Sequence, residues 1–290
     1  MTHLLLDFAR RNDGVLHSID PNPGFDVEAW QVKAGGNFVF HRDRSLNAIP
    51  QVGPVEVVLI DGDHNWYTVF HELSLLAQTA EASGAEFPVV LMHDIDWPYG
   101  RRDMYYDPAT VPEEYRGAHE KKGILPGQVG LADFGGLNPH LGNAQAEGGA
   151  RNGVLTAAED FLRGFGGDLV LTRLAGFHGL GILIARGITV RNRALQETLL
   201  LLKSRYEEDP HILALEASRV EAAIRAIELA AQIERRVGAE SARAETSEAE
   251  AKWLRMEFDR LKAVVEATHA RLASEESRAA ELDARLAEVT

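Results

Sequence analysis

Two short segments hold the residue types best suited to chemistry. The first reads Ile60-Asp61-Gly62-Asp63-His64 and the second Met92-His93-Asp94-Ile95-Asp96. Hard cations such as Mg²⁺ prefer carboxylate oxygens, and the vicinal hydroxyls of a substrate can complete an octahedral site. A histidine has a pKa suited to a base near neutral pH. The residues alone leave open a metal site, a metal-free site with His64 or Asp63 as the base, and a structural role in which these side chains bind loop amides.

The elements around these segments predict where they lie. Apolar runs of strand type, Val55–Ile60 and Phe87–Met92, come directly before them, and residues 66–82 have helical spacing. A strand, a crossover helix and a second strand form a βαβ unit with parallel strands. Ligands of open α/β sheets bind outside the carboxyl ends of the strands. We therefore expect both acidic segments at one edge of a sheet.

The rest of the first 190 residues continues this α/β pattern. We predict a helix that ends near residue 11, a short helix at residues 25–34 and a later helix at 153–162. Two further strands are expected at residues 15–19 and 37–41, and an antiparallel hairpin at 169–174 and 180–185. Residues 97–150 are rich in Gly, Pro and aromatics, which favours a functional loop or lid. Their aromatic side chains with Arg101 and Arg102 suit a sugar or aromatic acceptor that bears a carboxylate or phosphate, or a packed irregular loop.

Bulk composition limits the class of protein. The 290 residues contain no cysteine, which excludes disulfides, thiolate nucleophiles and zinc–thiolate sites, and the formal net charge of −14 disfavours nucleic acid as a partner. The first residues lack a basic region and a long apolar stretch, so we expect no signal peptide, and no apolar run is long enough to predict a membrane span. We expect a soluble, cytoplasmic protein that binds neither membrane nor nucleic acid.

The last hundred residues have a different character, so we predict domains at 1–190 and 191–290. From residue 254 the apolar positions step by four and three, which is a heptad pattern typical of a coiled coil. An earlier seam through Val220 and Ile224 is out of phase with it. Gly238 and the polar stretch 240–250 lie at the mismatch, so we predict two helical segments with a break there. We expect a homo-oligomer formed through the later seam; the alternative is a tail that folds back onto the domain as an antiparallel hairpin. The later seam consists of Leu254, Phe258, Leu261, Val265, Thr268, Leu272, Glu275, Ala279, Leu282, Leu286 and Val289.

The strand order, the acidic strand ends and the terminal hairpin together resemble a class I S-adenosylmethionine-dependent methyltransferase. The likeness is closer to the branch that methylates small molecules and sugars on oxygen, and it covers residues 4–187. Its most distinctive stretches are residues 60–67 and 93–102. The resemblance implies a Rossmann-like sheet followed here by a coiled-coil tail. It starts at the helix after the family's glycine-rich loop, so the strand and loop that approach the cofactor's methionine moiety have no counterpart in these residues.

The resemblance also implies how S-adenosyl-L-methionine would be held. Asp20 ends its strand and would accept the ribose hydroxyls, Asp43 and Ser45 would approach the adenine edge, and Asp61 would lie nearest the cofactor and the metal. Each assignment has a local alternative. Asp20 also suits a turn before proline, and Asp43 or Ser45 also suits the start of a helix.

The resemblance places a metal ion, Mg²⁺ by expectation, between Asp61, His93 and Asp94. His93 stands where the family often has an acid, and imidazole is a poorer Mg²⁺ ligand than carboxylate. A metal-free variant with Asp63 or His64 as catalytic base therefore stays open.

Together these features predict an enzyme that methylates a hydroxyl of a small metabolite or sugar. One alternative is a catalytically impaired methyltransferase-like head on a coiled-coil oligomerisation protein. A metal-dependent hydrolase is a third reading, and it does not account for Asp20 or the terminal hairpin.

Overall fold

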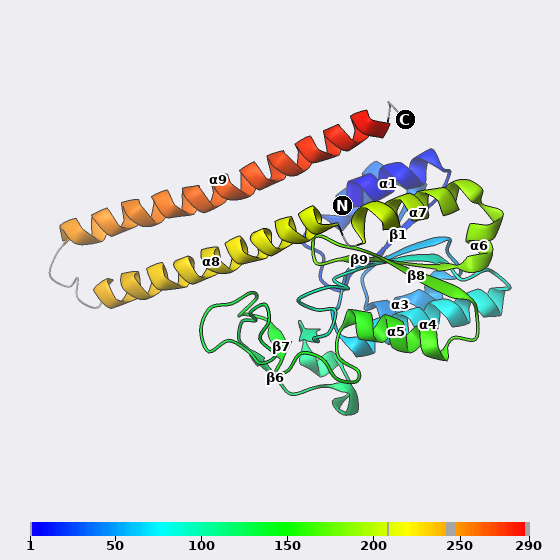
Figure 1. The fold of residues 1–290 in the computed structure, drawn as a ribbon, viewed down its shortest axis with the longest axis horizontal. Coiled ribbons are helices and arrows are strands. Elements are labelled where there is room, and N and C mark those ends of the chain that lie inside the picture. The colour runs from blue at the N-terminus through cyan, green and yellow to red at the C-terminus, as the bar shows by residue number, and fades with distance from the viewer. Residues whose placement is uncertain (1, 208, 242–247, 288–290) are drawn as a thin grey trace. The chain divides into compact units, whose positions relative to one another are not determined.

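A computed structural model describes residues 2–207, 209–241 and 248–287 of the chain (Figure 1). By internal contacts the chain divides into Met1–Val220 and Glu221–Thr290, whereas the sequence pattern places the boundary after residue 190. Helix α6 (Arg186–Arg191) lies at the predicted boundary. Beyond it, the first unit also includes α7 (Arg193–Tyr206) and the beginning of α8 (Pro210–Ser241).

The central sheet of the first unit has the strand order β3-β4-β9-β8. Strands β3 (Val57–Ile60) and β4 (Val89–His93) are parallel with Ile60 opposite Met92, which confirms the predicted βαβ unit. Strands β8 (Leu169–Leu174) and β9 (Leu180–Ala185) form the predicted antiparallel hairpin, and β9 lies antiparallel beside β4. Because β3 and β4 run in the same direction, the segments that follow them leave the sheet at one edge.

Two further strands make a sheet of their own. Strands β1 (Leu16–Ile19) and β2 (Phe38–His41) are parallel, with Ile19 opposite His41. The predicted short helix between them is α2 (Val27–Ala34), and α1 (Thr2–Arg11) precedes them. Helix α2 is followed by a 3₁₀ turn at Gly35–Asn37, and Asp26 caps its first turn by accepting a hydrogen bond from the Ala29 amide.

The crossover helix α4 (Trp66–Ser83) has well-defined ends, and its N-terminus fixes where the segment that carries His64 ends. The Asn65 side chain accepts a hydrogen bond from the Thr68 amide at the N-terminus, and Gly84 ends the helix at a φ of 67°. Its buried face, including Val69, Leu73 and Leu76, packs in the core with α5 (Val154–Gly164). Helix α3 (Ser45–Val52) also packs against α4.

The segment after β4 was predicted to be a loop or lid, and the structure instead shows a packed substructure. It contains a three-stranded sheet in the order β5-β7-β6. The strands are β5 (Met104–Tyr105), β6 (His119–Lys121) and β7 (Gly142–Ala144), with 3₁₀ turns at Pro108–Thr110 and Glu113–Tyr115. Periodicity does not reveal strands this short, and their backbone hydrogen bonds come from residues far apart in sequence.

The tail contains two long helices, α8 and α9 (Glu248–Ala287), in agreement with the prediction of two helical segments. Helix α8 continues through Gly238 to Ser241 and α9 starts at Glu248, so the two helices are separated within the predicted polar stretch 240–250 and not at Gly238 itself. The remaining part of the predicted break, residues 242–247, lies outside the described residues. Among the helices that the structure describes, none has the length and apolar character of a membrane span.

Candidate metal centre

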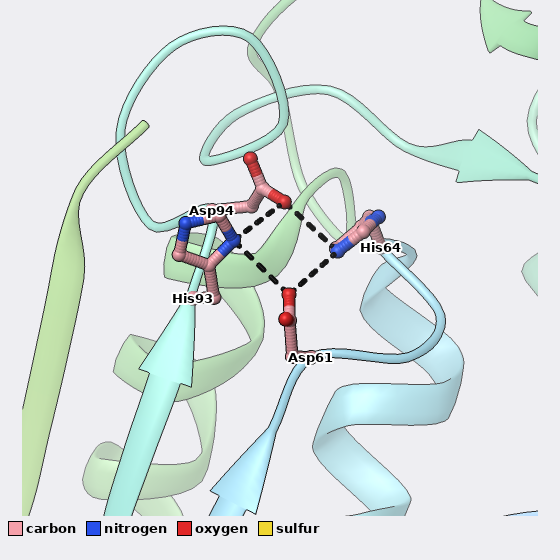
Figure 2. Close-up of side chains that lie close together, drawn as sticks. All are labelled: Asp61, His64, His93 and Asp94. Carbon is pink, nitrogen blue, oxygen red and sulfur yellow. Dashed lines mark hydrogen bonds and ion pairs between the residues drawn. The ribbon is translucent and has the colours of Figure 1, made fainter. Parts of the chain in front are cut away.

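Four side chains from the ends of β3 and β4 point toward one another (Figure 2). Asp61 follows β3, His64 precedes α4, His93 is the last residue of β4, and Asp94 comes next. One donor atom from each of the four lies within 4.8 Å of the others. The predicted convergence of Asp61, His93 and Asp94 is present, and His64 joins them. We call these four residues the rim cluster.

The donor atoms of the rim cluster alternate between nitrogen and oxygen. His93 Nδ1 lies 3.0 Å from Asp61 Oδ1 and 3.1 Å from Asp94 Oδ2. His64 Nε2 lies 2.9 Å from the same Asp94 oxygen and 3.8 Å from the same Asp61 oxygen. Two imidazoles thus face two carboxylates around a closed ring of four contacts.

These spacings suit a common cation. Bonds of about 2.1 Å place neighbouring ligands about 3.0 Å apart around an octahedral ion and about 3.4 Å apart around a tetrahedral one. His64 gives a second indication, because its ring is buried and Nε2, although close to Asp94, is not aligned for a hydrogen bond. An imidazole nitrogen buried beside two carboxylates without a well-formed hydrogen bond fits a metal ligand. The residues present therefore fit a divalent metal.

The backbone at Asp94 is part of this geometry. Asp94 has a φ of 58°, in the left-handed region that non-glycine residues seldom adopt, although Asp tolerates it better than most. Such conformations cost on the order of 1–3 kcal/mol and cluster at functional sites. Here the turn places the Asp94 carboxylate beside His93, its neighbour in sequence, and opposite His64.

Both histidines of the rim cluster favour the protonated form. The contacts to Asp61 and Asp94 raise the pKa of His93 to about 10, with burial acting in the opposite direction. For His64 burial is the largest influence and lowers the pKa, but contacts to the same two carboxylates outweigh it and raise the pKa to about 9. Without a metal, His64 is therefore a poor base near neutral pH.

The two carboxylates show the complementary behaviour. Burial favours their neutral forms, but the contacts with His64 and His93 prevail and lower the pKa of Asp61 to about 2. The pKa of Asp94 is lowered further below its usual range by the same two histidines, again against burial. Without a metal, two imidazolium groups thus balance the two carboxylates. A divalent cation bound between the four side chains would supply the same total positive charge.

Aromatic rings from the segment that follows β4 border the cluster. Tyr99 stacks on His64 with ring centroids 5.5 Å apart and planes 8° apart, and the Asn138 side chain donates a hydrogen bond to its hydroxyl. Tyr106 lies near the same imidazole and is 61% exposed. Tyr99 therefore orients a cluster residue, whereas Tyr106 is accessible to a bound molecule.

The two arginines suggested for acceptor binding are already engaged. Arg102 is fully buried, and its guanidinium donates to the backbone carbonyls of Gln128, Val129 and Ala144. Arg101 forms a two-pronged ion pair with Glu159 on α5. The prediction that these groups bind an acceptor anion is not supported by this geometry. Arg102 holds the packed segment together because its fork-shaped donors match several carbonyls at once.

A buried acid, Asp103, ties this segment to the helices around the site. One carboxylate oxygen accepts hydrogen bonds from the amides of Trp66 and Gly153, at the starts of α4 and α5, and the other accepts from the Tyr105 hydroxyl. Burial raises the pKa of Asp103 to about 6 despite these bonds. Asp103 thereby fixes the N-terminus of α4 immediately after His64.

The remaining predicted site residues lie outside the rim cluster. Asp63 accepts a hydrogen bond from the Thr68 hydroxyl at 3.1 Å, a local contact within the first turn of α4. Asp20 accepts from the Asn22 amide, as a strand-ending turn acid does. Asp43 accepts from the Arg44 amide and the Asn47 side chain. These contacts match the local alternatives to their predicted roles and leave those roles untested.

The sequence reasoning missed Glu72, which is a neighbour of the predicted site residue Ser45. The Ser45 side chain lies close to Glu72 of α4, a buried carboxyl group near Asp63 and His64, and acts to lower the pKa of that group. Burial raises the pKa of Glu72 to about 7, and its Oε2 has no hydrogen-bond partner in the described part of the chain. Helical spacing places Glu72 on the buried face of α4, which was the available signal. The sequence reasoning also did not place His64, three residues after Asp61, among the candidate metal ligands.

Comparison with known proteins adds no family assignment. Neither family models nor curated proteins nor solved structures give a match to this chain.

Proposed function

We propose that the protein is a metal-dependent transferase that uses S-adenosyl-L-methionine to methylate a hydroxyl group of a small metabolite or sugar. The observation that carries the proposal is the rim cluster, in which four ligand-type side chains converge where two parallel strands end. That edge is where open α/β sheets bind their ligands. The sheet order supports the class of transferase, because an antiparallel hairpin closes the sheet beside β4, as in the family that the sequence resembles.

Asp61, His64, His93 and Asp94 would hold the metal. A bound divalent cation lowers the pKa of a coordinated hydroxyl and so reduces the need for a separate base. The mixture of imidazole and carboxylate ligands suits Mn²⁺, Fe²⁺, Co²⁺ or Zn²⁺ better than Mg²⁺. We therefore expect Mn²⁺ to bind more tightly than the Mg²⁺ suggested by the sequence.

The surrounding residues would supply position and shielding. Tyr99 fixes the His64 ring, and Tyr106 provides an exposed aromatic face beside it for a sugar or ring of the acceptor. Asp20, at the end of β1, would bind the ribose hydroxyls of the cofactor. Much of the rate enhancement in a methyl transfer of this kind comes from alignment of the reacting atoms.

Calorimetry on the full chain tests both halves of the proposal. Mn²⁺ should bind to the wild-type protein and bind far more weakly to Asp61→Asn, while Asp63→Asn, whose side chain lies outside the cluster, serves as the matched control. S-adenosylhomocysteine is then titrated into the Mn²⁺-loaded protein. Metal binding without any nucleoside binding would reject the methyltransferase and leave the metal centre. No metal binding would reject the centre itself.

A further inference from the structure

Helix α9 has an apolar seam with no buried member among the residues whose exposure the structure describes. Phe258 is 41% exposed, and Leu254, Leu261 and Val265 are only partly covered. The part of the seam that lies within α9, from Leu254 to Leu286, extends about 50 Å along a straight helix. A stripe of this length is unfavourable in water unless a partner covers it.

The charges that flank the seam identify the partner. When Leu254 and Leu261 occupy heptad position d, and Phe258 and Val265 position a, the flanking positions are g and e. Glu257 at g then faces Lys262 at e of a second, parallel copy, and Arg271 at g faces Glu276 at e, so both pairs have opposite charge. The sequence repeats this relation at Arg278 and Asp283.

We propose that α9 forms a parallel, in-register coiled coil with α9 of a second copy of this chain. Leucine at d with valine at an a position is typical of two strands. The polar residues at later d positions, Thr268 and Glu275, meet their own counterparts only in the in-register arrangement. A polar core layer can specify register at a cost in stability, and the cost is larger at Glu275, where the two carboxylates repel each other.

Cysteine cross-linking tests orientation directly, because the chain has no cysteine of its own. In the full chain, Leu254→Cys should form a covalent dimer on mild oxidation, since parallel pairing brings the two copies of this position together. Met256→Cys, two residues away at the outward position f and 66% exposed, is the matched control and should cross-link much less. Equal cross-linking of both variants overturns the proposal, and so does a wild-type chain that sediments as a monomer.

Charge reversal tests the register. Lys262→Glu places two acidic residues opposite each other in each flanking pair and should weaken dimerisation several-fold, while adding Glu257→Lys should restore it. Sedimentation equilibrium measures the dimer constants. A double variant that stays as weak as the single one overturns the in-register pairing.

A separate observation concerns the turn between β8 and β9, which lies beside the rim cluster. The φ angles of Phe177 and His178 are 48° and 67°, two consecutive non-glycine residues in the left-handed region. The His178 ring lies 6.4 Å from that of His93, and its backbone carbonyl accepts a hydrogen bond from the Asp96 amide. The turn is therefore hydrogen-bonded to Asp96, three residues after β4 ends, and lies beside the His93 ring.

Glu216, near the start of α8, holds this turn. Its carboxylate accepts hydrogen bonds from the amides of Phe177 and His178 at 2.9 and 3.0 Å. Arg219 binds the same carboxylate and covers the Phe177 ring at 5.6 Å. The contacts with the turn and with Arg219 lower the pKa of Glu216 to about 2, against burial, so it is charged at physiological pH.

We infer that Glu216 is a positioning residue for the metal centre, acting through the turn on His93. The inference rests on the proposed metal site. Outer residues that orient metal ligands contribute about 10–100-fold to metal affinity. Because Glu216 acts through the turn and not on a ligand directly, we expect about a tenfold loss.

Mn²⁺ calorimetry on full-chain variants tests this role. Glu216→Ala should weaken Mn²⁺ binding about tenfold, and Glu216→Gln, which keeps one acceptor oxygen, should weaken it less. Glu221→Ala removes an exposed ion pair with Arg225 further along α8 and is the matched control. The visible spectrum of the Co²⁺-substituted protein should change with Glu216→Ala, because ligand geometry shifts.

The outcomes separate this inference from the proposed function. A Glu216→Ala chain that melts at a lower temperature but binds Mn²⁺ as the wild type does would show a purely structural role and overturn the inference. Failure of the wild type to bind Mn²⁺ would overturn the metal centre and the inference together.

Discussion

Acidic residues that follow parallel strands have different surroundings in two regions of the molecule: at the ends of β3 and β4, and at the ends of β1 and β2. Both strand pairs are parallel, and acidic residues follow both. At the first pair, Asp61 and Asp94 meet two histidines and their pKa values fall strongly. At the second pair, Asp20 and Asp43 bind groups within four residues of themselves. An acid at a strand end thus becomes part of a site only when neighbouring elements bring partners to it.

The largest test of this contrast is the pH dependence of metal binding. The pKa values of His64 and His93 are raised to about 9 and 10, so both are protonated in the metal-free protein at pH 7 and must lose their protons to bind a metal. Mn²⁺ affinity should therefore rise with pH, by up to about 100-fold per unit between pH 6 and 8. Calorimetry in two buffers of different ionisation enthalpy should detect about two protons released. Affinity that does not change with pH would mean that the histidines are not ligands.

A ligand substitution gives the next largest effect. Asp94→Asn keeps the size of the side chain and tolerates the left-handed backbone, but it removes the negative charge that faces both histidines. We expect Mn²⁺ affinity to fall by roughly 100-fold or more, measured by calorimetry. Asp43→Asn, an acid after β2, is the matched control and should leave Mn²⁺ affinity unchanged. Similar losses in both variants would remove the distinction between the two regions.

The ends of β1 and β2 have their own test with the nucleoside ligand. Asp20→Ala should weaken S-adenosylhomocysteine binding by about 1–3 kcal/mol, through loss of charge-assisted hydrogen bonds to the ribose. Mn²⁺ binding should not change, because Asp20 is not part of the rim cluster. Calorimetry of both ligands separates the effects. Unchanged nucleoside affinity would mean that Asp20 serves only the turn to Asn22.

The smallest expected effect is that of the local contacts at Asp43. Asp43→Ala removes the acceptor for the Arg44 amide and the Asn47 side chain, beside the start of α3. Because both contacts are local and exposed, we expect only a small decrease in stability, measured as a slightly lower midpoint of urea unfolding. A much larger loss would mean that Asp43 supports more than its own turn.

Many elements of the fold could be predicted because their signals are local. The apolar runs before Asp61 and His93 specify strands, and the helix between them is capped by Asn65 and Gly84, both typical cap residues. The same reasoning missed β5, β6 and β7, since strands of two or three residues leave no periodic pattern. It also suggested that Arg102 is available to a ligand, although that side chain is buried among carbonyl groups.

Sequence by itself determined which residues end β3 and β4, and it determined the heptad seam of α9, because both depend on neighbours a few positions apart. Only the tertiary structure decided that His64 joins the rim cluster while Asp63, one residue earlier, binds Thr68 instead. That choice depends on the pairing of β3 with β4 and on the left-handed turn at Asp94. It depends also on Asp103, which anchors the start of α4 from 37 residues away. Such contacts join residues that are close in space but distant in sequence, and a linear pattern of residue types does not encode them.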